Sequence, residues 1–295
     1  MEKGLWKIEN EEMSVTVNEF GAQMWSILGK DATEYLWQGD PKYWSERAIN
    51  LFPYVGRMPE KSYSLDGKTY QMDLHGFASG CRFAVKSHEK TRLVMELQDN
   101  PQTYIHYPRH FLFRVIFSLR KNTLEITYEV ENQDERKMYF GLGGHPGFNV
   151  PLKAGKKFED YHLRFHGKCE PVKIGFAENH LLNGEDCPFP LEKGYILKLY
   201  HELFQDGVIV LKGTDKTVTL ECEDDSHSVT VSFPQMPYFG IWHLPNSDAP
   251  YVCFEPWCSL PSADGKSTIF EEKDDLICLM PHRLYKNVWE ITVCE

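Results

Sequence analysis

Three segments of the chain combine side chains that transfer protons with a high density of glycine, proline and aromatic residues. The three segments are 50–78, 141–151 and 253–261. They contain His75, His145 and Glu255, respectively. A histidine with a reference pKa of roughly 6.5 can give a proton near neutrality, and a carboxylate can accept one. Brought together by the fold, these side chains form an acid, a base and a further hydrogen-bond donor.

Glu255 has apolar or aromatic neighbours, with Phe254 before it and Pro256 and Trp257 after it. Burial among such groups raises the pKa of a carboxyl above its reference of roughly 4.3, which suits a general base. The alternative is a structural carboxylate that caps a turn before Trp257.

His145 lies between glycines in the sequence GLGGHPGFNVP, and Pro146 follows it. Glycine allows a positive φ or a close approach of the backbone to a ligand, whereas proline restricts the chain that leaves the histidine. Because these three segments are dense in glycine and proline, we expect them to interrupt the strand pattern. Irregular segments on a rigid β-frame commonly carry functional side chains. The alternative for His145 is a tight turn without a function.

Elsewhere, apolar and polar residues alternate with a period of two, which is typical of half-buried antiparallel strands. The segments with this pattern are 124–131, 217–222 and 228–233. Asp224, Asp225 and Ser226 separate the last two and predict a hairpin loop.

The segment 111–120 is apolar on both faces except at Arg114 and Ser118, which predicts a strand buried between two layers. Helical periodicity is confined to a short helix expected near residues 41–48. No repeat, low-complexity tract or flexible linker divides the chain. The sequence therefore predicts an all-β fold, a large antiparallel β-sandwich that forms a single domain over residues 1–295.

Composition narrows the classes of function. The 295 residues are 42% hydrophobic and 14% aromatic, enough for a large core. The net charge of −11 disfavours nucleic acid and anionic membranes as partners. Acidic residues interrupt the beginning of the chain where a signal peptide needs an apolar core, and the eight cysteines form no C-x-x-C pair. We therefore expect a cytoplasmic protein with reduced thiols.

Taken in order, these motifs resemble the aldose 1-epimerase, or galactose mutarotase-like, family, and more closely its LacX-like branch. The matching segments are 50–57, 75–78, the Gly-His-Pro-Gly-Phe sequence at 144–148 and the Glu-Pro-Trp sequence at 255–257. The region 14–44 also resembles the first strands of this family. The motifs span most of the chain, and together they are far more specific than any one of them.

The resemblance implies a galactose mutarotase-like β-sandwich of the supersandwich type and an isomerase that interconverts the α and β anomers of an aldose. It implies Glu255 as the catalytic base and His145 as the catalytic acid. It also implies that His75 and Arg57 bind sugar oxygens.

Two further residues are candidates for substrate binding through the resemblance. Asn50 begins the first matching segment. Asp206, in HELFQDGVIVL, is a loose counterpart of an aspartate that binds sugar hydroxyls elsewhere in the family.

The chemistry of the side chains agrees with these roles. Interconversion of anomers requires removal of the proton from the C1 hydroxyl and protonation of the ring oxygen, so that the ring opens to an aldehyde and closes again. A carboxylate and a histidine suffice for both transfers, and no metal or organic cofactor is required.

Other functions fit parts of the pattern. A carbohydrate-binding module shares the aromatic content and the acidic charge but needs no matched histidine and glutamate. A glycoside hydrolase usually needs two carboxylates, and the sequence offers one strong candidate, Glu255. A metal site formed by His75, His145 and His243 lacks the H-x-H or H-x-x-x-H spacing that supports such sites.

The sugar itself is left open. It is an aldohexose with or without a phosphate, since Arg57, Arg82 and Arg109 would form a cationic pocket if the fold brought them together. Trp242 and His243 are further candidates to line the cleft, although core packing is favoured for the tryptophan. We expect a monomer or a weak homodimer.

Overall fold

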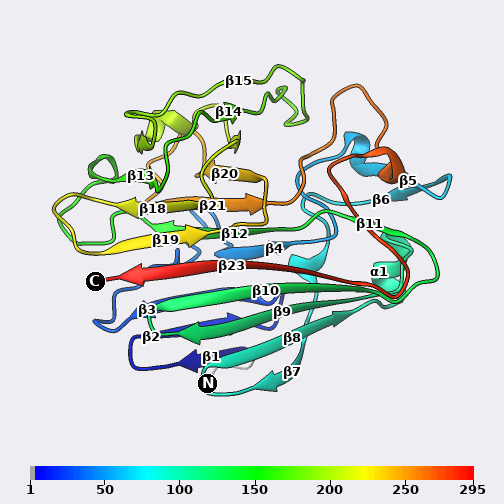
Figure 1. Ribbon diagram of the computed structural model, residues 1–295, viewed down its shortest axis with the longest axis horizontal. Coiled ribbons are helices and arrows are strands. Elements are labelled where there is room, and N and C mark those ends of the chain that lie inside the picture. The colour runs from blue at the N-terminus through cyan, green and yellow to red at the C-terminus, as the bar shows by residue number, and fades with distance from the viewer. Residues whose placement is uncertain (1–3) are drawn as a thin grey trace.

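The computed structural model describes residues 4–295, which fold almost entirely into antiparallel β-strands (Figure 1). Two large sheets, of nine and seven strands, lie one above the other. Side chains from both sheets meet in one hydrophobic core. The all-β antiparallel sandwich that the alternating pattern predicted is therefore confirmed.

The nine-stranded sheet contains the longest strands of the molecule. In spatial order its strands are β16 (Ile196–Lys198), β13 (His162–Phe165), β18 (Thr217–Glu221), β19 (Ser228–Ser232), β23 (Leu284–Cys294), β10 (Thr123–Asn132), β9 (Phe111–Arg120), β8 (Arg92–Gln98) and β7 (Ala84–His88).

The seven-stranded sheet carries the chemistry-bearing motifs in its centre. In spatial order its strands are β15 (Cys187–Pro188), β14 (Val172–Lys173), β17 (Ile209–Lys212), β20 (Tyr238–Trp242), β21 (Tyr251–Trp257), β12 (Gly143–Asn149) and β4 (Ala48–Leu51). The segments around His145 and Glu255 are thus neighbouring strands.

Three small sheets and several short helices complete the fold. The small sheets are β1 (Leu5–Glu9) with β2 (Met13–Asn18) and β3 (Gln23–Gly29), β5 (Ser62–Leu65) with β6 (Lys68–Gln71), and β11 (Met138–Phe140) with β22 (Ile277–Leu279). The 3-10 turns are Pro59–Lys61, Ala78–Gly80, Phe158–Asp160, His201–Phe204 and Phe270–Glu272.

The α-helix α1 (Pro101–His106) begins with a capping box that the sequence analysis did not identify. The side chain of Asn100 accepts hydrogen bonds from the backbone amides of Gln102 and Thr103, and the Thr103 hydroxyl accepts one from the Asn100 amide. Among residues 4–295, no helix has the length and apolar character needed to cross a membrane.

The predicted strands agree with β10, β18 and β19, and the hairpin loop at 224–226 joins the last two. The prediction for 111–120 is right for the bounds of β9 and wrong for one of its faces. That face stays partly exposed because Arg114 forms ion pairs there, the shortest with Glu96 at 2.7 Å.

The helix expected near residues 41–48 is wrong: residues 41–47 form turns, and β4 begins at Ala48. One helical turn does form, since the backbone amides of Tyr43 and Trp44 donate to the carbonyl of Asp40. The turn ends there because the indole of Trp37 donates a hydrogen bond to the Trp44 carbonyl at 2.8 Å. In a continuing helix, this carbonyl would accept from a backbone amide instead.

Both faces of β21 are buried, which is unusual at the surface of a sandwich. Val252 and Phe254 point into the core between the two large sheets. The opposite, outer face carries Glu255, with a small hydrophobic cluster around Trp257 on one side and another around Tyr251 on the other. Loops therefore cover the outer face of the seven-stranded sheet, and Glu255 lies between the two clusters.

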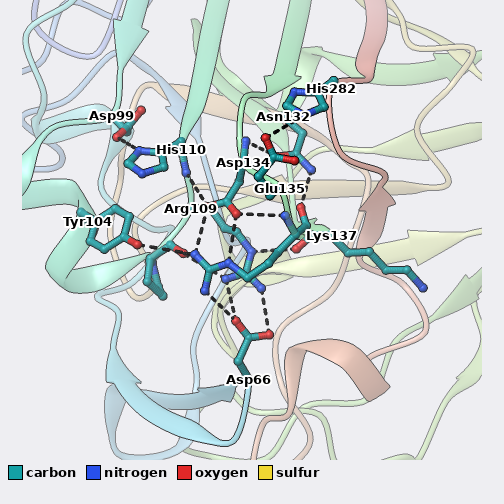
Figure 2. A network of polar contacts seen from close by, with 12 residues as sticks. Asp66, Asp99, Tyr104, Arg109, His110, Asn132, Asp134, Glu135, Lys137 and His282 are labelled. Carbon is teal, nitrogen blue, oxygen red and sulfur yellow. Dashed lines mark hydrogen bonds and ion pairs between the residues drawn. The ribbon is translucent and has the colours of Figure 1, made fainter.

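A buried arginine fixes the β5–β6 hairpin to the end of the nine-stranded sheet (Figure 2). The Arg109 side chain, 1% exposed, donates to both carboxylate oxygens of Asp66 at 3.0 and 3.1 Å and to the Lys137 carbonyl at 2.7 Å. The Arg136 guanidinium also donates hydrogen bonds to the carboxylates of Asp66 and Asp134. The hairpin leads directly into the segment that carries His75.

We expect Asp66→Asn to lower the free energy of unfolding by roughly 2 kcal/mol or more, because it leaves a buried guanidinium without its anionic partner. Urea unfolding followed by tryptophan fluorescence measures the change. The matched control is Asp73→Asn, which removes the exposed pair between Asp73 and Lys61 (75% and 70% exposed). That variant is expected to cost less than about 1 kcal/mol, and equal losses for the two variants contradict the prediction.

Candidate active site

Neighbouring central strands carry the candidate acid–base pair. β12 and β21 run antiparallel, with Gly143 opposite Trp257. Counting along both strands from this pair places His145 opposite Glu255. Because side chains alternate between faces, both point to the outer face of the seven-stranded sheet.

His145 and Glu255 are in direct contact. Nε2 of His145 lies 3.2 Å from Oε2 of Glu255, and the two residues are 7% and 1% exposed. Nδ1 of His145 and Oε1 of Glu255 are buried and have no hydrogen-bond partner among residues 4–295. Since most buried polar atoms are hydrogen-bonded, these two atoms are available to a polar ligand in the cavity that both side chains line.

The glycines around His145 serve close packing, and the expectation of an interrupted strand is wrong for this segment and for that of Glu255. Gly143 and Gly144 lie in β12 without a positive φ. A Cβ at Gly143 would lie 2.8 Å from the Trp257 ring, and one at Gly144 would lie 2.8 Å from the Trp289 ring. Aromatic rings thus pack directly on the backbone of β12.

A third glycine makes room for the carboxylate. Gly240 in β20 lies opposite Glu255, and a Cβ there would lie 2.9 Å from the Glu255 Cβ. Real Cβ atoms do not approach so closely, so any larger residue would displace Glu255 or separate the strands.

His75 reaches the pair from the loop after β6, with its backbone in the left-handed region at φ 62°. Its amide donates to the Gly56 carbonyl, and the Gly56 amide donates to its Nδ1, both at 3.1 Å. Because Nδ1 accepts this hydrogen bond, the neutral ring carries its proton on Nε2. The centroids of the His75 and His145 rings are 5.8 Å apart.

Burial controls the protonation of the three groups. Burial, with a smaller contribution from Arg57, lowers the pKa of His75 to about 4. Burial, followed by the charge of His75, lowers the pKa of His145 to about 3. Burial raises the pKa of Glu255 well above its usual value, although the nearby Trp257 indole N–H, a hydrogen-bond donor, lowers it in part. Burial therefore favours the neutral form of each member of this pair.

A cavity of about 350 Å³ opens above the pair, within the range of small-molecule sites. On the side of β12 and β4 it is lined by His145, Ile49 and His75. At the end of β20 it is lined by Trp242, Pro245 and Trp44, and beyond β20 by Val208, Gly207, Phe176 and His180. Glu255 and Trp257 form its floor, and Gly56, Arg57, Leu74 and Pro261 complete the wall.

Of the three arginines considered for a cationic pocket, only Arg57 lines this cavity. The Arg82 guanidinium pairs with Glu19 at 2.9 Å, and Arg109 is buried against Asp66. The fold therefore does not bring the three together.

Asn50 and Asp206 do not line the cavity. The side chain of Asn50 points to the opposite face of β4, where it donates to two backbone carbonyls and accepts from the Tyr128 hydroxyl at 2.7 Å. Ile49 occupies the cavity face instead, as the alternation of side chains requires. Asp206 is exposed, and its neighbours Gly207 and Val208 line the cavity in its place.

Trp242 lies in the cavity wall, whereas core packing was favoured from the sequence. His243 points the other way, is fully buried, and contacts His201 at 3.2 Å and the Leu244 carbonyl at 2.7 Å. Within residues 4–295, no group of three or more histidine, cysteine or acidic side chains is arranged to hold a metal ion.

Sequence reasoning missed the far wall of the cavity. Phe176 and His180 lie in the loop between β14 and β15, and Val208 precedes β17. The sequence around them, with Gly175 and Asn179, is that of an ordinary turn, so nothing in it indicated a ligand site.

The sequence matches the family model described as aldose 1-epimerase over residues 4–264. Two LacX proteins of Lactococcus lactis subsp. lactis, one chromosomal and one plasmid-borne, are each 30% identical to this chain. Each alignment covers 97% of this chain and 98% of the relative.

Solved structures with the same fold cover nearly the whole chain. A galactose mutarotase related enzyme from Lactobacillus acidophilus is 31% identical, with a TM-score of 0.94 over 99% of this chain and 97% of that one. A galactose mutarotase-like protein from Lactobacillus casei is also 31% identical, with a TM-score of 0.93 over 98% of this chain and 100% of that one. The predicted galactose mutarotase-like fold is thus confirmed.

We expect His75 and His145 to remain neutral from pH 8 down to pH 5 in an NMR titration of the histidine rings, with resonances assigned from His75→Gln and His145→Gln. His227 is the internal control, because the hydrogen bonds that its ring donates to the carboxylates of Asp31 and Asp225 raise its pKa. A midpoint above pH 6 for His75 or His145 contradicts the prediction.

The same shifts predict how stability depends on pH. Unfolded histidines bind a proton near pH 6.5, whereas folded His75 and His145 do so only near pH 4 and pH 3. Between these values the unfolded chain binds more protons, so the contribution of both residues is present above pH 6.5 and is lost as the pH falls. Urea unfolding of wild type and of the two glutamine variants at pH 7 and pH 5 measures this loss.

Proposed function

The chain belongs to the aldose 1-epimerase family, and from this premise we propose that it interconverts the α and β anomers of an aldose by opening and closing the sugar ring. The observation that carries the proposal is the buried contact between His145 and Glu255, 3.2 Å long, with an unpartnered atom on each side. A proton acceptor and a proton donor next to each other are what the reaction needs at C1 and at the ring oxygen.

The reaction balances with these two groups alone. The Glu255 carboxylate removes the proton of the C1 hydroxyl, the bond between C1 and the ring oxygen breaks, and His145 gives its proton to that oxygen. Rotation about the C1–C2 bond then presents the opposite face of the aldehyde to the hydroxyl that closes the ring. On closure, His145 takes its proton back from the attacking hydroxyl and Glu255 returns its proton to the new C1 oxygen.

The single proton of the pair fits this cycle. Burial raises the pKa of Glu255 and lowers that of His145, which favours the proton on Glu255. Hydrogen bonds from sugar hydroxyls to the carboxylate favour its ionised form, which transfers the proton to His145 and creates the base and the acid together. Each positioned transfer typically contributes 10²- to 10⁴-fold to a rate.

His75 and Arg57 have supporting roles in the proposal. His75 presents Nε2–H to the cavity and stays neutral, so it stabilises the charge that develops on a sugar oxygen without giving up its proton. Arg57 lines the rim and binds hydroxyls with its planar set of donors.

The alternatives are weaker on specific grounds. A binding module gains nothing from a carboxyl that is 1% exposed and contacts a buried histidine, because burying such a group costs free energy. A glycoside hydrolase needs two carboxylates at the bond, and Glu255 is the one acidic side chain among those that line the cavity.

We expect Glu255→Gln to lower kcat at least 10²-fold while changing sugar affinity little, since the amide keeps the shape and loses the base. The decay of optical rotation of fresh α-D-glucose and α-D-galactose, corrected for the spontaneous rate, measures kcat. Glu223→Gln, at an exposed turn, is the control and should match wild type. Near-normal turnover by Glu255→Gln rejects this residue as the base, and no acceleration of any aldose by wild type rejects the function.

We further propose that the sugar is not phosphorylated. Arg57 is the one arginine or lysine that lines the cavity, and the buried carboxyl of Glu255 lies in the same space. A phosphate group carries nearly two negative charges and usually requires several cations or backbone amides.

Hexose phosphates should therefore react poorly. For D-glucose 6-phosphate we expect a kcat/KM at least about 10-fold below that for D-glucose, measured by the same polarimetric assay at equal ionic strength. A preference for the phosphorylated sugar contradicts this proposal and leaves the anomer interconversion itself intact.

A further inference from the structure

The wall of the cavity away from the acid–base pair contains a single charged or titratable side chain. We propose that His180, which none of the motifs includes, binds the hydroxyl groups at the end of the sugar remote from C1 and thereby determines which aldoses are accepted. The inference rests on the proposed function, because the position of C1 is set by His145 and Glu255.

The strand order fixes where His180 lies. From β12 with His145, the sheet continues through β21 with Glu255 and β20 to β17. Gly207, just before β17, lies next to the His180 ring, since a Cβ there would lie 3.5 Å from its Cε1. Two strand spacings of about 4.8 Å separate β21 from β17. Gly207 also lies three residues before Val210, which is level with Glu255 through Gly240, so His180 lies at the far end of the cavity on the side opposite His145. In the proposed binding mode, the end of the sugar remote from C1 points toward it.

The loop holds His180 in a defined conformation. Its φ of 62° places it in the left-handed region at the tip of a turn, where its amide donates to the Ala177 carbonyl. The Asn179 side chain donates to Asp264 at 2.8 Å and accepts from the Leu181 amide. These bonds fasten the turn to the chain segment that follows β21, so the floor and the far wall of the cavity are connected.

The ring of His180 is free to bind a ligand. No group among residues 4–295 forms a hydrogen bond with it, in contrast to His75, whose Nδ1 is occupied by Gly56. The rest of the far wall, Phe176, Gly207 and Val208, offers no polar side chain. The two ring nitrogens of an imidazole can form hydrogen bonds, which suits one or two adjacent sugar hydroxyls.

The test compares sugars that differ only at the remote end. D-glucose and D-galactose differ in the orientation of the C4 hydroxyl, and D-xylose lacks the C6 hydroxymethyl group of D-glucose. The variant is His180→Gly, because glycine keeps the left-handed backbone that alanine would strain. His180→Asn, which also tolerates this region, tests whether a shorter polar side chain restores part of the effect.

For His180→Gly we expect a rise in KM for glucose of about 10-fold with kcat within about 2-fold of wild type, since one hydrogen-bonding group is lost far from the reacting atoms. At least one of the two kcat/KM ratios, glucose to galactose or glucose to xylose, should change about 5-fold. The matched control is His282→Gly, a histidine with φ 57° outside the cavity, which should leave both ratios unchanged.

Two results separate failure of this inference from failure of the proposed function. If wild type accelerates mutarotation but His180→Gly changes neither ratio by more than 2-fold, or lowers kcat for all three sugars equally, His180 is not the specificity-determining residue. If wild type accelerates no sugar, the function fails, and His180 is tested by binding instead. Quenching of the cavity tryptophans by the three sugars then gives Kd ratios, and unchanged ratios in His180→Gly overturn the inference.

Discussion

The constraint on which the structure depends is a carboxyl group buried in the middle of a β-sheet. Glu255 is 1% exposed, and an isolated ionised carboxylate in such a place is very unfavourable. Burial raises the pKa of this carboxyl and so favours its neutral form, and His145 Nε2 lies 3.2 Å from one of its oxygens. The two residues meet because β12 and β21 are neighbours in the observed register.

Burying this pair requires other segments to cover the outer face of the seven-stranded sheet, whose inner face already lies in the core. Two satellite hydrophobic clusters flank Glu255, and loops from distant parts of the chain complete the cover. Their placement depends on polar anchors, namely Arg109 on Asp66 for the hairpin before His75, and Asn179 on Asp264 for the far wall. The cavity is thus assembled by contacts that lie outside it.

The sequence predicted the parts of the fold in which one face differs from the other. β10, β18 and β19 each bury one face, so alternation revealed them, whereas β12 and β21 bury both faces and lose the alternation. Glycines in β12 were interpreted as irregular backbone, although tryptophan rings pack against them. Asn50 was included because it belongs to a motif, and the alternation along β4 turns it away from the cavity. His180 was missed because three-dimensional proximity alone distinguishes it.

The reaction was therefore easier to infer than the substrate, for a physical reason. Proton transfer to and from C1 depends on a few buried groups whose pKa values respond strongly to their surroundings, and such groups leave a record in motifs. Under the proposed function, the remaining hydroxyls would face a largely apolar wall supplied by loops, where water can satisfy what the protein does not. Because the far wall comes from loops outside the strands that carry His145 and Glu255, exchange of its residues would change which sugar the proposed site accepts without disturbing the pair.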